Sequence, residues 1–388
     1  MIHAAMGERS PGESFWALGL RLERAGDVQG ALSAYSEAVD ADEEPPNPRA
    51  TLRAAEQHEM RGNTAIAAEE FARATVAPEP DVQAAAWRGV ANSRLHRGDH
   101  AGALEALEAM AAAGDPDETP RAWRNIGTLK EDLFGDVEGA KRAYEAAIAC
   151  EHPLNSDGAR VNLAQLLEKQ GDIAGAAARF REVVASGHPV ESGRARTLLA
   201  WLLEAQGDEQ GALALFLDGM AEEPTGEWGQ RAAFGAGTIF RNRGEFDRAL
   251  DAFALAERIE DPASAGPATY LLAGVAKQLG QEQVALEAFS RLARNTGVAP
   301  AVAADAAKEA GLILFERREI AAARDLFALA AEAEEGEARA RGCLLLALCE
   351  RQLGNRPAAL AAAEKAIATP GAPPEVIDHG SGLVAELS

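Results

Sequence analysis

The hydrophobic positions of this chain follow a helical period that is interrupted about every 36 residues. Residues 160–189 show the pattern most clearly. Apolar residues recur at helical spacing over residues 161–170 and again over residues 173–185, with Gly171 and Asp172 between the two runs and Pro189 after the second. Glycine can end a helix in the left-handed conformation, and a following aspartate can cap the next helix. The pattern therefore predicts a hairpin of two helices.

The same hairpin recurs along the whole chain. Its turn position is occupied in order by Gly26, Gly62, Gly98, Gly135, Gly171, Gly207, Gly244, Gly280, Arg318 and Gly354. The successive spacings are 36, 36, 37, 36, 36, 37, 36, 38 and 36 residues. Neither helix of such a hairpin can bury its apolar face alone, so the hairpins are expected to be stable only when they stack on one another.

Three further positions repeat in register with the turn. Five residues after it stand Ala31, Ala67, Ala103, Ala140, Ala176, Ala212, Ala249, Ala285, Ala323 and Ala359. Four residues later stand Tyr35, Phe71, Leu107, Tyr144, Phe180, Phe216, Phe253, Phe289, Phe327 and Ala363. Before the turn, a small residue recurs, as at Gly19, Ala55, Ala91, Ala164, Ala200, Gly237, Ala273, Gly311 and Ala347. The alanines predict close helix crossings, and the mostly aromatic series predicts plugs between successive hairpins.

This pattern resembles the tetratricopeptide repeat. The fourth repeat carries it most fully, with Trp123, Asn125 and Gly127 before the turn and Ala140, Tyr144 and Ala147 after it. The period is about two residues longer than the commonest value of about 34, and the extra residues fall at proline-bearing joints such as Pro189. The resemblance implies an all-α, right-handed superhelical solenoid of about ten stacked helix-turn-helix repeats.

The repeat pattern also sets expectations for the rest of the chain. We expect a flexible lead-in over residues 1–12, the array over residues 13–370, and a tail over residues 371–388. The tail could form a short capping helix, interrupted by Gly380 and Gly382, or remain free. Arg318 predicts a strained or reshaped turn. Ala363 in the plug position suits a terminal repeat, because nothing that needs a plug is expected to follow it.

Composition limits the possible functions. The net charge of −23 disfavours nucleic acid as a partner, because clustered Lys and Arg hold phosphate backbones. No phosphate-binding GxxxxGK sequence occurs, and Gly235 and Gly237 belong to a repeat helix instead of a dinucleotide loop. His96 and His100 lie on either side of the turn at Gly98, so they do not share a helical face for a metal.

The cysteines and the apolar runs of the chain set further expectations. The three cysteines are expected to be small core residues, and no cofactor is expected. The first residues lack an apolar signal region, and no apolar run is long enough to span a membrane, so we expect a cytoplasmic protein that is not an enzyme.

The tetratricopeptide resemblance implies that the first helix of each hairpin lines the concave surface. By register, the inward-facing candidates for a peptide-binding groove are Arg49, Arg53, Arg88, Asn92, Arg121, Arg124, Asn125, Asn162, Gln165, Arg194 and Arg231. This is an uneven placement of cations in an acidic chain. Several of these arginines, and Arg341, stand at the start of a helix, where the helix dipole favours anions. A different interaction is expected to select them there.

These residues predict an adaptor that binds an extended, acidic or C-terminal peptide segment of a partner protein. Asn125 and Asn162 occupy equivalent positions and could pair with a peptide backbone whatever its sequence, while arginines would bind carboxylates. Three alternatives stay open. The arginines could pair only with acidic residues of neighbouring repeats, the chain could be a scaffold that self-associates through its ends, its tail or its convex face, or it could be a sensor whose pitch changes with a ligand.

Overall fold

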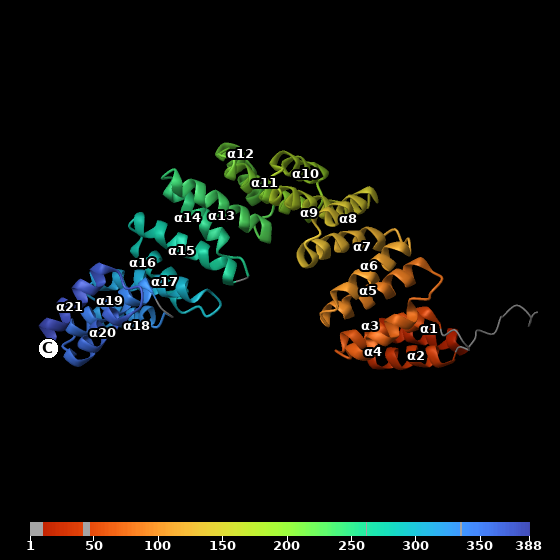
Figure 1. Ribbon diagram of the computed structural model, residues 1–388, viewed down its shortest axis with the longest axis horizontal. Helices are drawn as coiled ribbons and strands as arrows, with labels where there is room; N and C mark the ends of the chain where they lie inside the picture. Colours follow the sequence, from red (N-terminus) through yellow and green to blue (C-terminus); the bar gives the residue numbers. More distant parts are fainter. Residues whose placement is uncertain (1–10, 42–46, 261, 334–335) are drawn as a thin grey trace, which may run out of the picture. The chain divides into compact units, whose positions relative to one another are not determined.

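The computed structural model describes residues 11–41, 47–260, 262–333 and 336–388, and it is built of helices connected by short turns (Figure 1). No strand occurs in these residues. The first ten helices and one π-helical turn are α1 (Pro11–Arg24), α2 (Val28–Ala41), α3 (Pro48–Met60), α4 (Thr64–Ala74), α5 (Pro80–His96), α6 (His100–Ala112), α7 (Glu118–Leu129), η1 (Lys130–Phe134), α8 (Val137–Ala149), α9 (Ser156–Lys169) and α10 (Ile173–Ser186).

The remaining helices continue the same alternation. They are α11 (Glu191–Ala205), α12 (Glu209–Glu222), α13 (Glu227–Asn242), α14 (Phe246–Ala256), α15 (Pro262–Gln278), α16 (Glu282–Ala293), α17 (Pro300–Glu316), α18 (Ile320–Ala331), α19 (Glu337–Gln352), α20 (Arg356–Ala368) and α21 (Pro374–Leu387). None of the helices in the described ranges is long and apolar enough to cross a membrane.

The chain divides into two compact units, and each is described here by itself. Unit one is Met1–Ala195 and unit two is Arg196–Ser388. Within each unit the helices pair in chain order, α1 on α2 and α3 on α4 in unit one, α13 on α14 and α15 on α16 in unit two, and each pair then packs on the next. This arrangement confirms the predicted all-α solenoid of stacked hairpins.

The turn inside each hairpin has the left-handed backbone that the sequence predicts. The nine turn glycines have φ between 63° and 84°. Arg318 adopts φ 64° at the same position, although its side chain makes this conformation unfavourable. The turn is therefore strained, as expected, and it keeps the conformation of the glycine turns instead of being reshaped.

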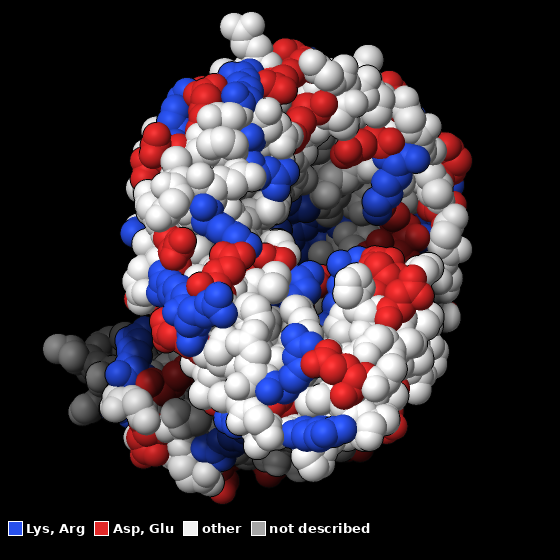
Figure 2. Space-filling model, turned by 90° about the vertical axis from the view of Figure 1, so that its left-hand side faces the viewer, with Lys and Arg blue, Asp and Glu red and all other residues white. Residues whose placement is uncertain are grey.

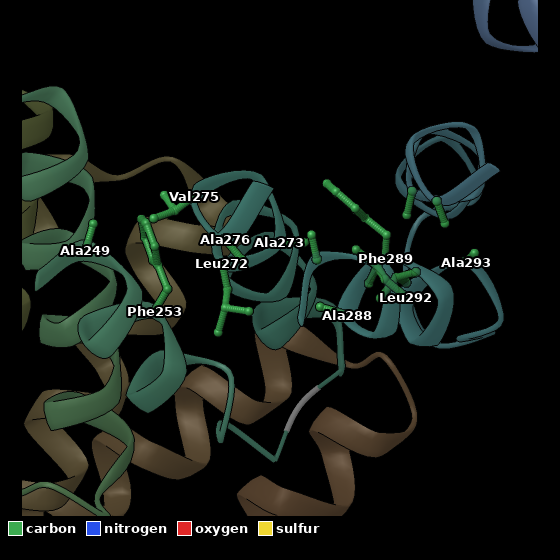
Figure 3. Packing of buried hydrophobic residues seen from close by; sticks show 14 of the residues in the cluster. Ala249, Phe253, Leu272, Ala273, Val275, Ala276, Ala288, Phe289, Leu292 and Ala293 are labelled. Carbon is green, nitrogen blue, oxygen red and sulfur yellow. The ribbon is translucent and has the colours of Figure 1, made fainter. Parts of the chain in front are cut away.

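The repeated alanines and aromatic residues form the core. All ten alanines and the whole plug series are buried. In unit two, Phe253 extends from α14 toward Val275 of α15 (Figure 3). The small residue before the turn leaves room for the plug of the same hairpin, because a Cβ added at Gly311 would lie 2.5 Å from the Phe327 ring. These contacts confirm the plug interpretation.

Aspartates after the turn cap many of the second helices. The carboxylate of Asp172 accepts a hydrogen bond of 2.9 Å from the backbone amide of Gly175 at the start of α10. Asp99, Asp136 and Asp208 make the same bond at α6, α8 and α12. This interaction satisfies one of the backbone amides that a helix N-terminus leaves without a partner.

The fourth hairpin contains one extra residue, and the backbone accommodates it as a π turn. Eight residues separate Gly127 from the turn at Gly135, whereas seven separate the small residue from the turn in the other repeats. The last turn of this first helix widens to the π-helix η1, which ends at the left-handed Gly135. A π turn is how a helix absorbs one inserted residue, and such turns are frequent at functional sites.

The C-terminal residues bear on two expectations. Helix α21 runs without interruption from Pro374 to Leu387, and Gly380 lies buried against Ile367 of α20. Ala363 is followed by this helix, whose Leu383 packs in the same apolar cluster. The sequence predicts that nothing after Ala363 needs a plug, and α21 packs there against the small side chain. The small side chain suits the close approach of α21.

Two further expectations concern the cysteines and the N-terminus. Cys343 and Cys349 are buried, but Cys150 is exposed at the end of α8, so the prediction of three core cysteines was wrong for Cys150. Its last-turn position leaves it beside solvent. Residues 1–10 of the expected lead-in lie outside the described residues, and Pro11 and Gly12 already belong to α1.

Candidate peptide-binding surface

The first helices of unit one place ten of the eleven candidate residues on neighbouring elements. Successive first helices, such as α5 and α7 or α7 and α9, pack directly on each other. We call their candidate residues the first-helix face of unit one. It consists of Arg49, Arg53, Arg88, Asn92, Arg121, Arg124, Asn125, Asn162, Gln165 and Arg194. Arg231 belongs to unit two.

Three arginines of this face gather where α7, α9 and the start of α11 meet. The charges of Arg121 and Arg194 both act on Arg124. A guanidinium nitrogen of Arg194 lies 2.8 Å from Oε1 of Gln165 and 3.3 Å from Oδ1 of Asn162, and it donates to both. The structure therefore brings together Arg121, Arg124, Arg194, Asn162 and Gln165, and we call these five residues the arginine cluster.

Arg124 is the most enclosed of the three arginines. Its guanidinium lies so close to the α9 backbone that a Cβ added at Gly158 would stand 2.8 Å from Nη1. Burial lowers the pKa of Arg124, and the charges of Arg121 and Arg194 lower it further against the opposing effect of Glu191. An arginine remains charged under such conditions. A cation is therefore held in a partly desolvated position beside two others.

Carboxylates at the helix starts partly balance the cluster. Glu118 of α7 pairs with Arg88 of α5 and with Arg121, at 3.4 Å in the second case. Glu191 lies 3.5 Å from Arg194. The second oxygen of Glu118, Oε2, is buried and has no hydrogen-bond partner among the described residues.

The same pairing occurs at other helix starts. Arg231 lies 2.9 Å from Glu227, and Arg341 lies 2.7 Å from Glu337 and 2.9 Å from Glu375. Glutamate in the first turn suits the helix dipole, and arginine three or four residues later suits the glutamate. This answers the question of what places arginine at the helix starts. The Glu-x-x-Arg and Glu-x-x-x-Arg spacings were readable in the sequence.

The other candidate arginines lie apart from the cluster. Arg49 lies 3.5 Å from Glu79 of the next repeat, and Arg53 lies 2.8 Å from Glu56 on its own helix. Arg231 stacks over Trp228, with 5.3 Å between the guanidinium carbon and the ring centroid. On the face shown in Figure 2, basic and acidic side chains are likewise interspersed. Pairing within the array, the simplest of the open alternatives, therefore accounts for much of the basic surface.

Asn92 and Asn125 line a separate pocket of about 390 Å³ beside the cluster. Its other lining residues are Leu95, Leu107, Thr128, Leu129, Asp132 and Leu133. Neither asparagine side chain has a hydrogen-bond partner within the described parts of the chain. The repeat register predicts both amides but not the leucines, because an apolar residue in a repeat is normally explained by the core.

The chemistry available on this face is recognition by charge and hydrogen bonds. Arginine offers forked donors to carboxylates, and side-chain amides can both donate to and accept from a peptide backbone. Among the described residues, no group of three or more His, Cys, Asp or Glu side chains is arranged to hold a metal ion.

Comparison with known proteins supports the repeat assignment. The family model described as "Tetratricopeptide repeat" matches residues 17–82, 61–119 and 161–226. No curated protein matches the chain. Among solved structures, the protective antigen c5321, present in uropathogenic Escherichia coli strains and displaying an SLR fold, is similar over 92% of this chain and 77% of its own, with 17% identity and a TM-score of 0.52.

Two other solved structures match a smaller part of the chain. PilF of Pseudomonas aeruginosa is 17% identical over 57% of this chain and 95% of its own, with a TM-score of 0.43. YrrB, described as a tetratricopeptide repeat protein with an unusual peptide-binding site, is 22% identical over 54% of this chain and 97% of its own, with a TM-score of 0.40. The family-model matches show tetratricopeptide repeats over residues 17–119 and 161–226, and the stacked hairpins of the other described helices carry the same repeated residues.

Proposed function

We propose that this protein is a non-enzymatic adaptor whose first-helix face in unit one binds an extended, acidic segment of a partner protein. The observation that carries the proposal is the environment of the Arg124 guanidinium. Its guanidinium is partly desolvated beside Arg121 and Arg194, and it makes no hydrogen bond or close ion pair with any described residue.

The energetics of the cluster favour an added anion. Removing a charge from water is costly unless it gains a partner, and the neighbouring like charges add to that cost. Glu118 and Glu191 supply two negative charges, whereas Arg88, Arg121, Arg124 and Arg194 supply four positive ones. A carboxylate from a bound peptide would meet Arg124 with charge-assisted hydrogen bonds of the kind that arginine forms best.

The neighbouring polar groups suit a peptide backbone. The Asn125 amide has no partner among the described residues and can both donate to and accept from a backbone. Such contacts are independent of peptide sequence, so the arginines would supply the preference for acidic residues. The same arrangement would suit a peptide C-terminus.

One form of the rival scaffold function would dimerise through the C-terminal tail, and three apolar residues of that tail are engaged elsewhere. Val376, Leu383 and Leu387 of α21 are buried against the preceding helices. Arg341 and Arg351 form ion pairs with Glu375 and Glu386 on the same helix. A terminal helix with a polar outer side is the usual means of closing a repeat array. No specific observation favours the sensor.

A phage-displayed random peptide library tests the proposal. The wild-type protein is expected to enrich peptides that contain Asp or Glu, and their affinity should fall as salt rises. Arg124→Met keeps most of the side-chain volume and should weaken the selected peptides at least tenfold. Arg179→Glu is the matched control, because Arg179 is an exposed arginine on the second helix α10 and pairs with Glu182. It should leave binding within about twofold.

Two results would contradict the proposal. One is selection of peptides with no enrichment of acidic residues. The other is unchanged binding of acidic peptides by Arg124→Met, with circular dichroism showing that the variant is folded.

A further inference from the structure

Two departures from the repeat pattern occur at one place in unit one. Leu107 of α6 occupies the plug position, where most of the other hairpins carry Phe or Tyr. The helix that packs on it, α7, carries the inserted residue and ends in the π turn η1. Each departure alone has a structural explanation, but both lie on the same pocket, which Leu107, Leu129 and Leu133 line.

A pocket also lies at the corresponding place one repeat earlier, over the aromatic plug Phe71, with a volume of about 330 Å³. Polar residues line that pocket, among them Glu59, Ser93 and Arg97. The equivalent positions around Leu107 are Leu95, Leu129 and Leu133. The pocket of the fourth hairpin is therefore distinguished by its apolar lining.

The π turn adds apolar surface at the mouth of this pocket. Leu133 is 50% exposed and Leu95 is 36% exposed, whereas Leu107 at the floor is 3% exposed. The pocket volume of about 390 Å³ is sufficient for one large side chain. A floor of buried leucine with a rim of exposed leucine and two free amides matches the mixture of apolar lining and few polar groups that is typical of binding pockets.

We propose that this pocket receives one bulky aliphatic or aromatic side chain of the same acidic partner segment that the arginine cluster binds. The inference rests on the proposed function and extends it to the sequence of the partner. Asn92 and Asn125 would hold the peptide backbone on either side of the inserted side chain. The occupant is a segment of another protein that combines negative charge with an apolar anchor, because Arg121 and Arg124 precede the pocket on α7. Asp132 lines the other end of the pocket, so the acidic residue is expected on the arginine side of the anchor.

The spacing of the two subsites follows from the helix that carries both. Arg121, Asn125 and Leu129 lie four residues apart on one face of α7. At about 1.5 Å of rise per residue, Arg121 and Leu129 are roughly 12 Å apart along the axis, and Arg124 is roughly 7.5 Å from Leu129. An extended peptide covers about 3.3 Å per residue. The acidic residue and the apolar anchor are therefore expected about two to four residues apart.

Selection from the random peptide library also tests this inference. The wild-type protein should enrich Leu, Ile, Met or Phe at a fixed distance of about two to four residues from the acidic position. Two variants alter the pocket in different ways. Leu107→Phe should reduce its depth with the aromatic ring that other repeats carry, and Leu133→Ser should remove its apolar rim. Each should weaken a selected peptide about tenfold or more, the effect expected for losing burial of one large apolar side chain.

Phe134→Ser provides the matched control. Phe134 is an exposed apolar residue of the same π turn, but it does not line the pocket. Its replacement should leave peptide affinity within about twofold. A peptide in which alanine replaces the apolar anchor should bind the wild type and Leu133→Ser equally.

The outcomes separate this inference from the proposed function. If acidic peptides are selected and depend on Arg124, but carry no apolar preference or bind Leu133→Ser unchanged, the pocket inference is overturned and the adaptor proposal survives. If no acidic peptide is selected, both fail. If the wild type dimerises and Leu133→Ser abolishes the dimer without any peptide being selected, a second copy of the chain occupies the pocket and the inference is overturned.

Discussion

At the scale of single residues, the turn positions test how much backbone strain the array carries. Arg318 has φ 64° where the other repeats have glycine. A left-handed conformation costs a residue with a Cβ about 1–2 kcal/mol, whereas glycine adds about 0.4–1 kcal/mol of unfolded-state entropy. The backbone strain of Arg318 therefore outweighs the entropy that a glycine would lose on folding. Arg318→Gly is expected to stabilise the hairpin by about 0.5–1 kcal/mol.

Hydrogen exchange of the amides in α17 and α18 would measure this effect locally, because repeat arrays need not unfold in one step. Arg318→Ala is the control, since it removes the same side chain but keeps the Cβ. Arg318→Ala should increase the stability of the hairpin very little. Equal stabilisation by Ala and Gly would show that the long side chain, and not the backbone, is the source of the cost.

A second residue-scale prediction concerns the close contact between Gly311 and the plug Phe327. A Cβ at Gly311 would lie 2.5 Å from the ring, so Gly311→Ala should cost about 1–3 kcal/mol through overpacking. Gly274 is the matched control, because it also lies inside a helix and a Cβ there would meet nothing within 4 Å. Gly274→Ala should instead stabilise α15 by up to about 1 kcal/mol. Urea unfolding of both variants measures the difference, and a similar sign for both would contradict the plug interpretation.

At the scale of one element, the aspartates after the turn act as helix caps. Asp172→Ala removes the 2.9 Å bond to the Gly175 amide and should destabilise α10 by about 1 kcal/mol. Gln281 occupies the same position before α16 without a side-chain cap bond, so Gln281→Ala should change stability very little. Thermal unfolding followed by circular dichroism compares them. Equal effects of the two substitutions would show that the cap bond contributes nothing.

Much of the fold was predictable at this scale because every repeat carries the same kinds of structural residue at the same positions. A turn glycine, a buried alanine and a plug recur in register, so one hairpin indicates the others. The π turn was not predicted, although the spacing from Gly127 to Gly135 contains the extra residue. An insertion in a helix-loop-helix pattern can be placed in the loop or in the helix, and the sequence does not decide between them. The sequence left a capping helix and a free tail open after residue 370. It also predicted an interruption at Gly380, because glycine usually weakens a helix, whereas Gly380 allows a close crossing.

At the scale of the whole molecule, the net charge is negative, but the named charges that meet around α7 are mostly positive. The chain carries a net charge of −23, yet four arginines and two glutamates meet around α7. The candidate arginines could be selected from the sequence by their register. Which of them gather could not, because Arg49 has the same register as Arg121 but pairs with Glu79 of the next repeat. The pocket beside them owes its apolar lining to four leucines, and a repeat pattern assigns such apolar residues to the core.

The proposed function depends above all on Arg124 binding a carboxylate of the partner segment. A double-mutant cycle tests this contact, with Arg124→Met in the protein and Glu→Gln in a selected acidic peptide, and with affinities measured by fluorescence anisotropy. Close charge pairs in interfaces give coupling energies of about 1.5 kcal/mol or more, and we expect a value in that range. If the two changes add to within about 0.5 kcal/mol, Arg124 does not contact the carboxylate and the proposed function is contradicted.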